Sequence, residues 1–87
     1  MPRPSDPYTP INCEFHDALE ATATRRANAV IRFIDDDGNP QARDTRIVTL
    51  SARDGIEYAE LGTGERVRLD RLVEVDGTSL ADFPPSA

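Results

Sequence analysis

Cys13 and His16 are the chain's one thiol and one imidazole, three residues apart. On a helix this spacing places two side chains side by side, and a Cys beside a His can act as a nucleophile with its general base. No third group that orients the base and no oxyanion donor is recognisable with them. The better interpretation is that Cys13 is a small half-buried residue at a helix start and that His16 points to solvent. We expect no enzyme.

Two other segments resemble ligand-binding loops only in part. Residues 35–39, Asp-Asp-Asp-Gly-Asn, lack the alternating acids and the later glutamate of an EF-hand calcium loop. Residues 62–64, Gly-Thr-Gly, lie between two strand patterns rather than before a helix, where a phosphate loop belongs. We therefore predict an acidic turn and a hairpin loop, with no metal and no cofactor.

Arg66 and Arg68 alternate on one strand face, and Tyr58 shares that face across the hairpin. Cations with an aromatic side chain can bind single-stranded RNA by charge and stacking. Aromatic residues are scarce here, however, and Glu57, Glu60 and Glu65 neutralise the row. Structural cross-strand pairs are the better interpretation, with direct RNA binding kept as an alternative.

Glu14, Asp17 and Glu20 fall on one side of a helical projection, while Phe15 and Leu19 fall on the other. One side of such a helix packs on the core and the other is an acidic surface. An acidic helix face is usually only solvated. It is nevertheless the strongest candidate for a contact with a basic partner.

The elements that must position these groups are one helix and several short strands. Asn12 is a favourable N-cap, so we predict a helix at about 13–26. Strand patterns lie at about 28–35, 41–50, 56–61, 65–69 and 71–75. The first strand has apolar residues at both odd and even positions, which predicts that both of its faces are covered. This single domain spans 11–76, between a Pro-rich arm at 1–10 and a tail at 77–87 that we expect to be flexible.

The fold class follows from this order of elements. If Gly64 is the left-handed residue of a three-residue loop, Glu60 lies opposite Arg66 and Tyr58 opposite Arg68. Five short strands cannot bury both faces as a flat sheet in a chain of 87 residues. We predict a mainly β, α+β fold in which the N-terminal helix packs on a small, strongly bent antiparallel sheet or barrel of five strands.

Composition limits the partners of the chain. Its net charge is −6, all ten basic residues are Arg, and residues 1–24 carry one Arg against four acids, a net −3. Such a chain is a poor nucleic-acid ligand and suits a basic partner better. One Cys cannot form an internal disulfide, and no apolar run has the length of a membrane helix or a signal peptide. We expect a cytoplasmic protein.

The N-terminal string also carries a family resemblance. Tyr8-x-Pro-Ile-Asn-Cys-acid-x-x-Asp-x-Leu-Glu, together with Glu57-Tyr58 and the later Arg68-Leu69-Asp70, resembles the Rho-binding antiterminator family (Rof/YaeO) of Gram-negative bacteria. The resemblance covers Tyr8 to Val75. It implies a helix on a small bent barrel similar to that of Sm proteins.

In function, the resemblance implies a protein that binds the transcription termination factor Rho and inhibits termination by occupying the N-terminal domain surface that captures RNA. Glu14, Asp17 and Glu20 match acidic positions of the family and are the first candidates for contacts with Rho. Phe15 and His16, which stand where the family has a second acid and an aromatic residue, complete the set of candidate contacts with Rho. Phe15 is then either a core residue or an apolar contact, and an adaptor for another basic protein is the further alternative.

Overall fold

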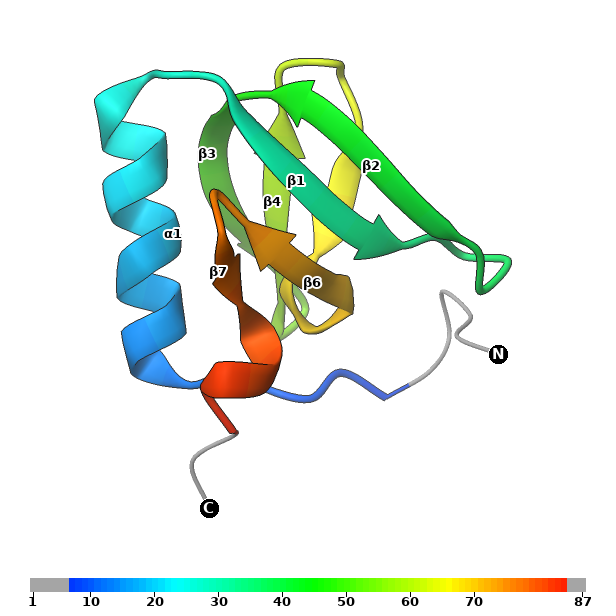
Figure 1. The fold of residues 1–87 in the computed structure, drawn as a ribbon. Helices are drawn as coiled ribbons and strands as arrows, with labels where there is room; N and C mark the ends of the chain where they lie inside the picture. Colours follow the sequence, from blue (N-terminus) through cyan, green and yellow to red (C-terminus); the bar gives the residue numbers. More distant parts are fainter. Residues whose placement is uncertain (1–6, 85–87) are drawn as a thin grey trace.

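The structure is a computed structural model that describes residues 7–84, in which one α-helix is followed by seven short strands (Figure 1). The outer ends of the expected arm and tail, residues 1–6 and 85–87, lie outside this range. No helix of the described range is long and apolar enough to cross a membrane. In chain order the elements are α1 Cys13–Arg25, β1 Ala29–Ile34, β2 Pro40–Thr45, β3 Ile47–Arg53, β4 Ile56–Leu61, β5 Arg66–Arg68, the 3-10 helix η1 Leu69–Arg71, β6 Leu72–Val75, β7 Thr78–Ser79 and the 3-10 helix η2 Leu80–Asp82.

The ends of α1 are set by its neighbouring residues. The Asn12 side chain accepts a hydrogen bond from the backbone N–H of Glu14 at 2.8 Å, as an N-cap does. Its Nδ2 also donates to the carbonyl of Pro84 at 2.9 Å. At the other end Arg26 is left-handed, with φ 55°, and its N–H donates to the carbonyl of Ala23. The helix therefore lies within the predicted range.

The strands form two antiparallel sheets, in the orders β2-β1-β6-β7 and β3-β4-β5. The expectation of a single five-stranded barrel is wrong, because the described strands divide between two sheets and do not close into a barrel. The strand predicted at 41–50 is two strands, separated at Arg46. Thr45 and Ile47 are buried on either side of Arg46, so the chain passes from one sheet to the other without leaving the core.

Residues 77–84, expected to belong to the tail, continue the fold. Asp76 and Gly77 have φ values of 52° and 80°, which suit a two-residue hairpin turn, and β7 pairs with β6 through this turn. After η2 the ring of Phe83 packs against Phe15, with centroids 5.8 Å apart.

The hairpin β4–β5 has the predicted register. Glu60 pairs with Arg66 and Tyr58 with Arg68. Gly64 has φ 93°, the left-handed conformation that the three-residue loop requires. This prediction is confirmed because a short loop and its flanking pairs are determined locally.

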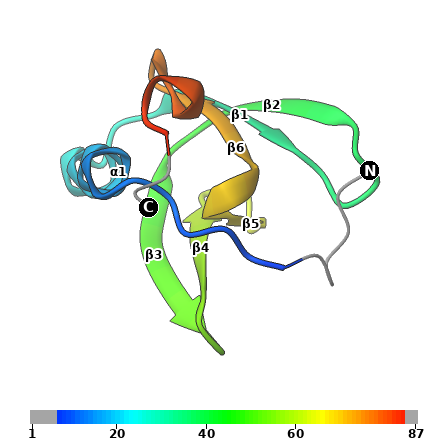
Figure 2. The ribbon, with the colours of Figure 1, turned by 90° about the horizontal axis from the view of Figure 1, so that it is seen from below.

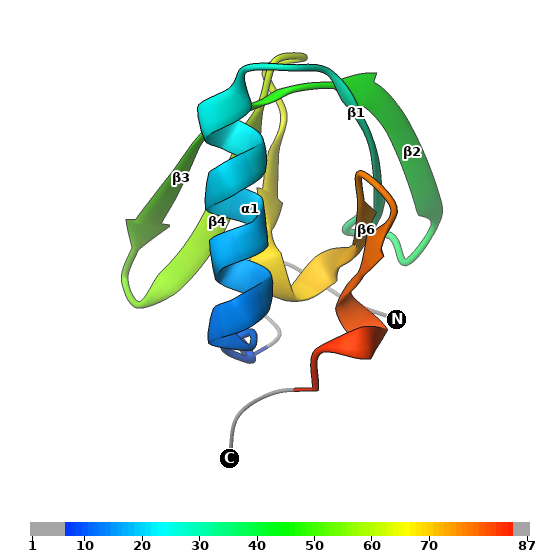
Figure 3. The same cartoon turned by 60° about the vertical axis from the view of Figure 1, so that its left-hand side comes forward.

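The core lies between the two sheets, and α1 covers their open side (Figure 3). Seen from below, α1 lies beside β3 and on the opposite side of the molecule from β2 (Figure 2). The helix contributes Phe15 and Leu19, whose exposed fractions are 0% and 1%. The strands and η1 contribute the rest of this cluster, namely Ile31, Phe33, Ile47, Ala59, Leu61, Val67, Leu69, Leu72 and Val75.

Strand β1 has only one covered face. Ala29, Ile31 and Phe33 are buried, whereas the alternate residues Val30 and Arg32 are exposed. The expectation of cover on both faces is therefore wrong. An apolar run identifies the strand but does not show which of its faces the rest of the chain covers.

Candidate partner-binding surface

Glu14, Asp17 and Glu20, which we call the acidic stripe, are all exposed on α1. This is the orientation that the helical spacing predicted, with Phe15 and Leu19 buried on the other side. In the described part of the chain, no Arg forms an ion pair with a member of the stripe. The carboxylates of Glu14 and Asp17 are therefore available to solvent or to a partner.

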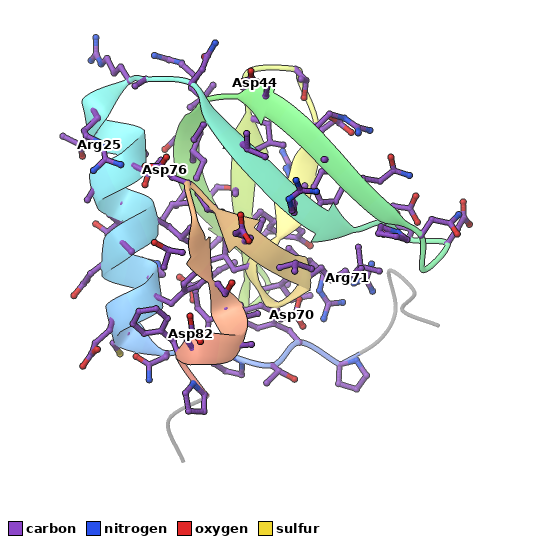
Figure 4. The ribbon with its side chains drawn as sticks, viewed as in Figure 1. Arg25, Asp44, Asp70, Arg71, Asp76 and Asp82 are labelled. Atoms are coloured by element: carbon purple, nitrogen blue, oxygen red, sulfur yellow. The ribbon has the colours of Figure 1, made fainter. Side chains whose placement is uncertain are left out.

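Many acidic side chains elsewhere are neutralised by arginine. Figure 4 shows one such pair, in which Arg25 of α1 and Asp76 of the β6–β7 turn point toward one another. The hydroxyl of Thr63 and the guanidinium of Arg43 lower the pKa of Glu65. Within residues 7–84, arginines pair with acids in Arg25–Asp76 at 3.0 Å, Arg43–Glu65 at 2.9 Å, Arg66–Glu60 at 4.0 Å, and Arg68–Asp70 and Arg71–Asp36 at 2.6 Å.

His16 lies between two carboxylates. Its Nδ1 is 2.8 Å from Oε1 of Glu20, and its Nε2 is 3.0 Å from Oε2 of Glu57 in β4. The expectation that His16 points to solvent is wrong, because only 26% of its side chain is exposed. The structure therefore joins Glu57 to the acidic stripe.

Glu57 was not predicted as a site residue because it lies 41 residues from His16 along the chain. The available signal is the period of a strand, in which alternate residues share a face. Glu57 has the same parity as Ala59 and Leu61, which are buried. Its side chain therefore belongs to the face that α1 covers.

Tyr8 connects Glu57 to a buried ion pair. Its hydroxyl donates to Oε1 of Glu57 at 3.4 Å, and its ring centroid is 5.7 Å from the guanidinium carbon of Arg68. Partial burial and the charges of Glu57 and Asp70 raise the pKa of Tyr8. Arg68 is held by Asp70, which also accepts a hydrogen bond from the backbone N–H of Thr9 at 3.0 Å. The segment before α1 is thereby fastened to the sheet.

The cations considered for RNA binding do not form an exposed row. Only 5% of the Arg68 side chain is exposed, and its guanidinium donates to Asp70 and to the carbonyl of Pro7. Arg66 remains 48% exposed and lies 5.5 Å from the ring centroid of Tyr58. The alternative RNA-binding surface therefore keeps one of its two arginines.

For Phe15 and Cys13 the structure changes the interpretation drawn from the sequence. Phe15 is a core residue with an exposed fraction of 0%, so it cannot be an apolar contact for a partner. Cys13 is exposed rather than half-buried, and within residues 7–84 no hydrogen bond joins it to His16. The ring nitrogens of His16 face carboxylates instead, so the Cys–His pair is not formed.

Residues 35–39 form the expected acidic turn. Oδ1 of Asp35 accepts hydrogen bonds from the backbone N–H groups of Asp37 and Asn39, both at 2.9 Å, and Oδ2 accepts one from Gln41. These hydrogen bonds, that of Asn39 foremost, lower the pKa of Asp35. The carboxylate of Asp35 therefore holds the turn together.

A groove of about 590 Å³ lies between α1 and β3, next to the acidic stripe. His16, Glu20 and Glu57 line it from the helix and β4, and Val48 and Leu50 line it from β3. Val48 is 46% exposed. A partner side chain would find apolar contacts beside two carboxylates in this groove.

Comparisons of the chain with protein-family models, curated proteins and solved structures find no match. The function is therefore argued from the surface itself, the acidic stripe with Glu57 beside it.

Proposed function

We propose that the chain binds the transcription termination factor Rho and inhibits Rho-dependent termination by covering the primary RNA-binding surface of Rho. The observation that carries the proposal is the acidic stripe, whose three carboxylates are exposed and, in the described part of the chain, have no Arg partner. A surface that captures RNA is rich in Arg and Lys, because phosphate contacts supply much of its affinity. The stripe competes with phosphate for these cations.

The spacing of the stripe suits this competition. Its members are three residues apart, which is about 4.5 Å of helix rise per step. The three carboxylates therefore lie close together on one side of the helix, where a cationic groove built for phosphates can contact more than one of them. The net charge of −6 also steers the encounter with a cationic partner.

The segments that carry the resemblance to the Rof/YaeO family support the same proposal, because they meet in space. Tyr8 contacts Glu57 and Arg68, Arg68 pairs with Asp70, and Asn12 caps the helix that bears the stripe. The N-terminal helix on antiparallel strands agrees with the α+β fold class that the resemblance implies, although the described strands form two sheets and not the implied barrel.

The test compares two double variants that change the net charge equally. Glu14→Gln with Asp17→Asn neutralises two of the three acids of the stripe and leaves Glu20 with His16. Asp37→Asn with Asp44→Asn neutralises two exposed acids of the β1–β2 turn and β2, which also have no Arg partner in the described chain; Asp44 is labelled in Figure 4. Binding to the purified N-terminal domain of Rho is measured by calorimetry.

We expect the stripe variant to raise the Kd by about tenfold or more, and the control variant to change it by less than about threefold. Rho-dependent termination in vitro should recover with the stripe variant and remain inhibited with the control. Equal losses in the two variants would mean that overall charge, not the stripe, drives binding. Binding of single-stranded RNA by the chain alone, in a gel shift, would favour the RNA-binding alternative.

A further inference from the structure

The imidazole of His16 bridges two elements that are distant in sequence. Nδ1 faces Glu20, one turn further along α1, at 2.8 Å, and Nε2 faces Glu57, from β4, at 3.0 Å. Both distances are within hydrogen-bonding range. We call this group the histidine clamp.

The chemistry of the clamp depends on one proton. Ionised carboxylates only accept hydrogen bonds, and a neutral imidazole has one donor and one acceptor nitrogen. A neutral His16 therefore satisfies one of the two carboxylates and turns a lone pair toward the other. Only the imidazolium donates to both Glu20 and Glu57, so the complete clamp is the protonated one.

The charged groups around the clamp are predominantly acidic. From α1, Asp17 lies near His16 and Glu20. One carboxylate oxygen of each acid and one ring nitrogen of His16 lie within 4.8 Å of one another. From the segment before α1, Tyr8 donates to Glu57. Arg68 lies beyond Tyr8, where Asp70 neutralises it, and Arg26 lines the same groove as the clamp from the helix C-terminus.

We propose that His16 makes the binding of a cationic partner proton-linked, because the imidazolium and a partner's guanidinium or ammonium group compete for the carboxylates of Glu20 and Glu57. With imidazolium the three groups carry a net −1, and with neutral imidazole they carry −2. Loss of the proton therefore both releases a carboxylate and strengthens the local negative charge. The identification of the partner as Rho rests on the proposed function, whereas the clamp is a property of this chain.

The proton linkage has a defined sign. A cation that displaces the clamp expels the proton of His16, so affinity rises as the pH rises through the range in which His16 loses that proton. One proton released per partner bound limits the effect to about tenfold in Kd per pH unit. His16 is a positioning residue in this scheme, since it acts through the two glutamates.

The experiment measures the Kd for the Rho N-terminal domain at constant ionic strength, at about pH 6 and about pH 8, a range in which His is the side chain that ordinarily titrates. We expect the wild-type chain to bind several-fold more tightly at the higher pH. The His16→Gln variant has no titrating ring, and its change over the same range should be at least about threefold smaller. Equal pH dependence in the two proteins would overturn the proposal, since any titration on Rho is common to both.

A second measurement needs no partner. His16 is the only histidine of the chain, so its ring nitrogens give unambiguous NMR signals. We expect N–H signals from both nitrogens in acidic solution, and the Glu57→Gln variant should change the Nε2 signal selectively. A ring whose nitrogens respond to neither Glu20→Gln nor Glu57→Gln would overturn the clamp. If Rho fails to bind at every pH while the clamp is observed, the proposed function fails, and so does Rho as the partner of the clamp.

Discussion

The guanidinium of Arg68 meets the carboxylate of Asp70 through two hydrogen bonds, of 3.0 and 2.6 Å, with only 5% and 12% of the two side chains exposed. Neutralising Asp70 weakens two charge-assisted hydrogen bonds of the buried guanidinium, and hydrogen bonds to charged groups contribute about 1.5–3 kcal/mol each. Asp70→Asn should therefore lower the free energy of unfolding by an amount of this order, measured by urea titration.

The control for this prediction is Asp76→Asn, which breaks the Arg25–Asp76 pair. Both side chains of that pair are 55% exposed, so its loss should cost less than about 1 kcal/mol. Asn also tolerates the left-handed conformation of Asp76, whose φ is 52°. Comparable losses in the two variants would show that burial of Arg68 and Asp70 does not govern the energetics.

Tyr8 predicts how stability changes in alkaline solution. Its pKa is raised in the folded protein above the ordinary 10.0, so the unfolded chain releases the phenolic proton first. Tyr8 therefore contributes fully to the free energy of unfolding below about pH 10, and this contribution is lost as the pH rises further. In urea titrations above this pH, the free energy of unfolding should fall less with pH for Tyr8→Phe than for the wild type. The control variant Tyr58→Phe retains Tyr8, so its free energy of unfolding should fall with pH as much as that of the wild type. An equally large fall in Tyr8→Phe would contradict the assignment to Tyr8.

Gly62 lies against the point where the chain changes sheets. A Cβ at Gly62 would be 2.7 Å from Oγ1 of Thr45, and the backbone N–H of Gly62 donates to the carbonyl of Arg46 at 2.9 Å. Gly62→Ala should therefore cost about 1–3 kcal/mol by overpacking. In a double-mutant cycle, Thr45→Ala should recover part of that loss by removing the clashing atom. Strictly additive losses would mean that Thr45 is not the obstacle.

Binding to the Rho N-terminal domain should weaken as salt is added. Contacts between exposed charges are screened over about 8 Å at physiological ionic strength. The dependence of Kd on salt should be steep for the wild-type chain and shallower after Glu14→Gln with Asp17→Asn, because fewer ionic contacts remain. Equal salt dependence in the two proteins would show that these carboxylates do not face cations of the partner.

The features that the sequence predicts well are those determined by near neighbours. The Asn12 cap, the burial of Phe15 and Leu19 and the β4–β5 register each depend on residues within a few positions of one another. The helical period alone placed the acidic stripe on the exposed side of α1. Interactions between such near neighbours leave few alternative local structures.

The features that were missed depend on contacts between distant segments. A residue such as Arg46 shows no local sign that the strands on its two sides belong to different sheets. Two-residue β7 is too short for a strand pattern and exists because Asp76 and Gly77 turn it back onto β6. Glu57 joins the acidic stripe only through His16, which no periodicity within α1 can reveal.

The hydrogen bond from Asn12 to the carbonyl of Pro84 bears on how the protein is labelled or immobilised. It places the end of the described chain at the start of α1, beside Glu14. A fluorophore, affinity tag or sensor-chip linker attached just after Pro84 would therefore crowd the acidic stripe and reduce the apparent affinity for a partner. The β1–β2 turn lies on the far side of the molecule from α1 (Figure 1), and Asp37 in that turn is exposed. A cysteine introduced at this position, with Cys13 replaced by Ser, would carry the label without covering the surface under study.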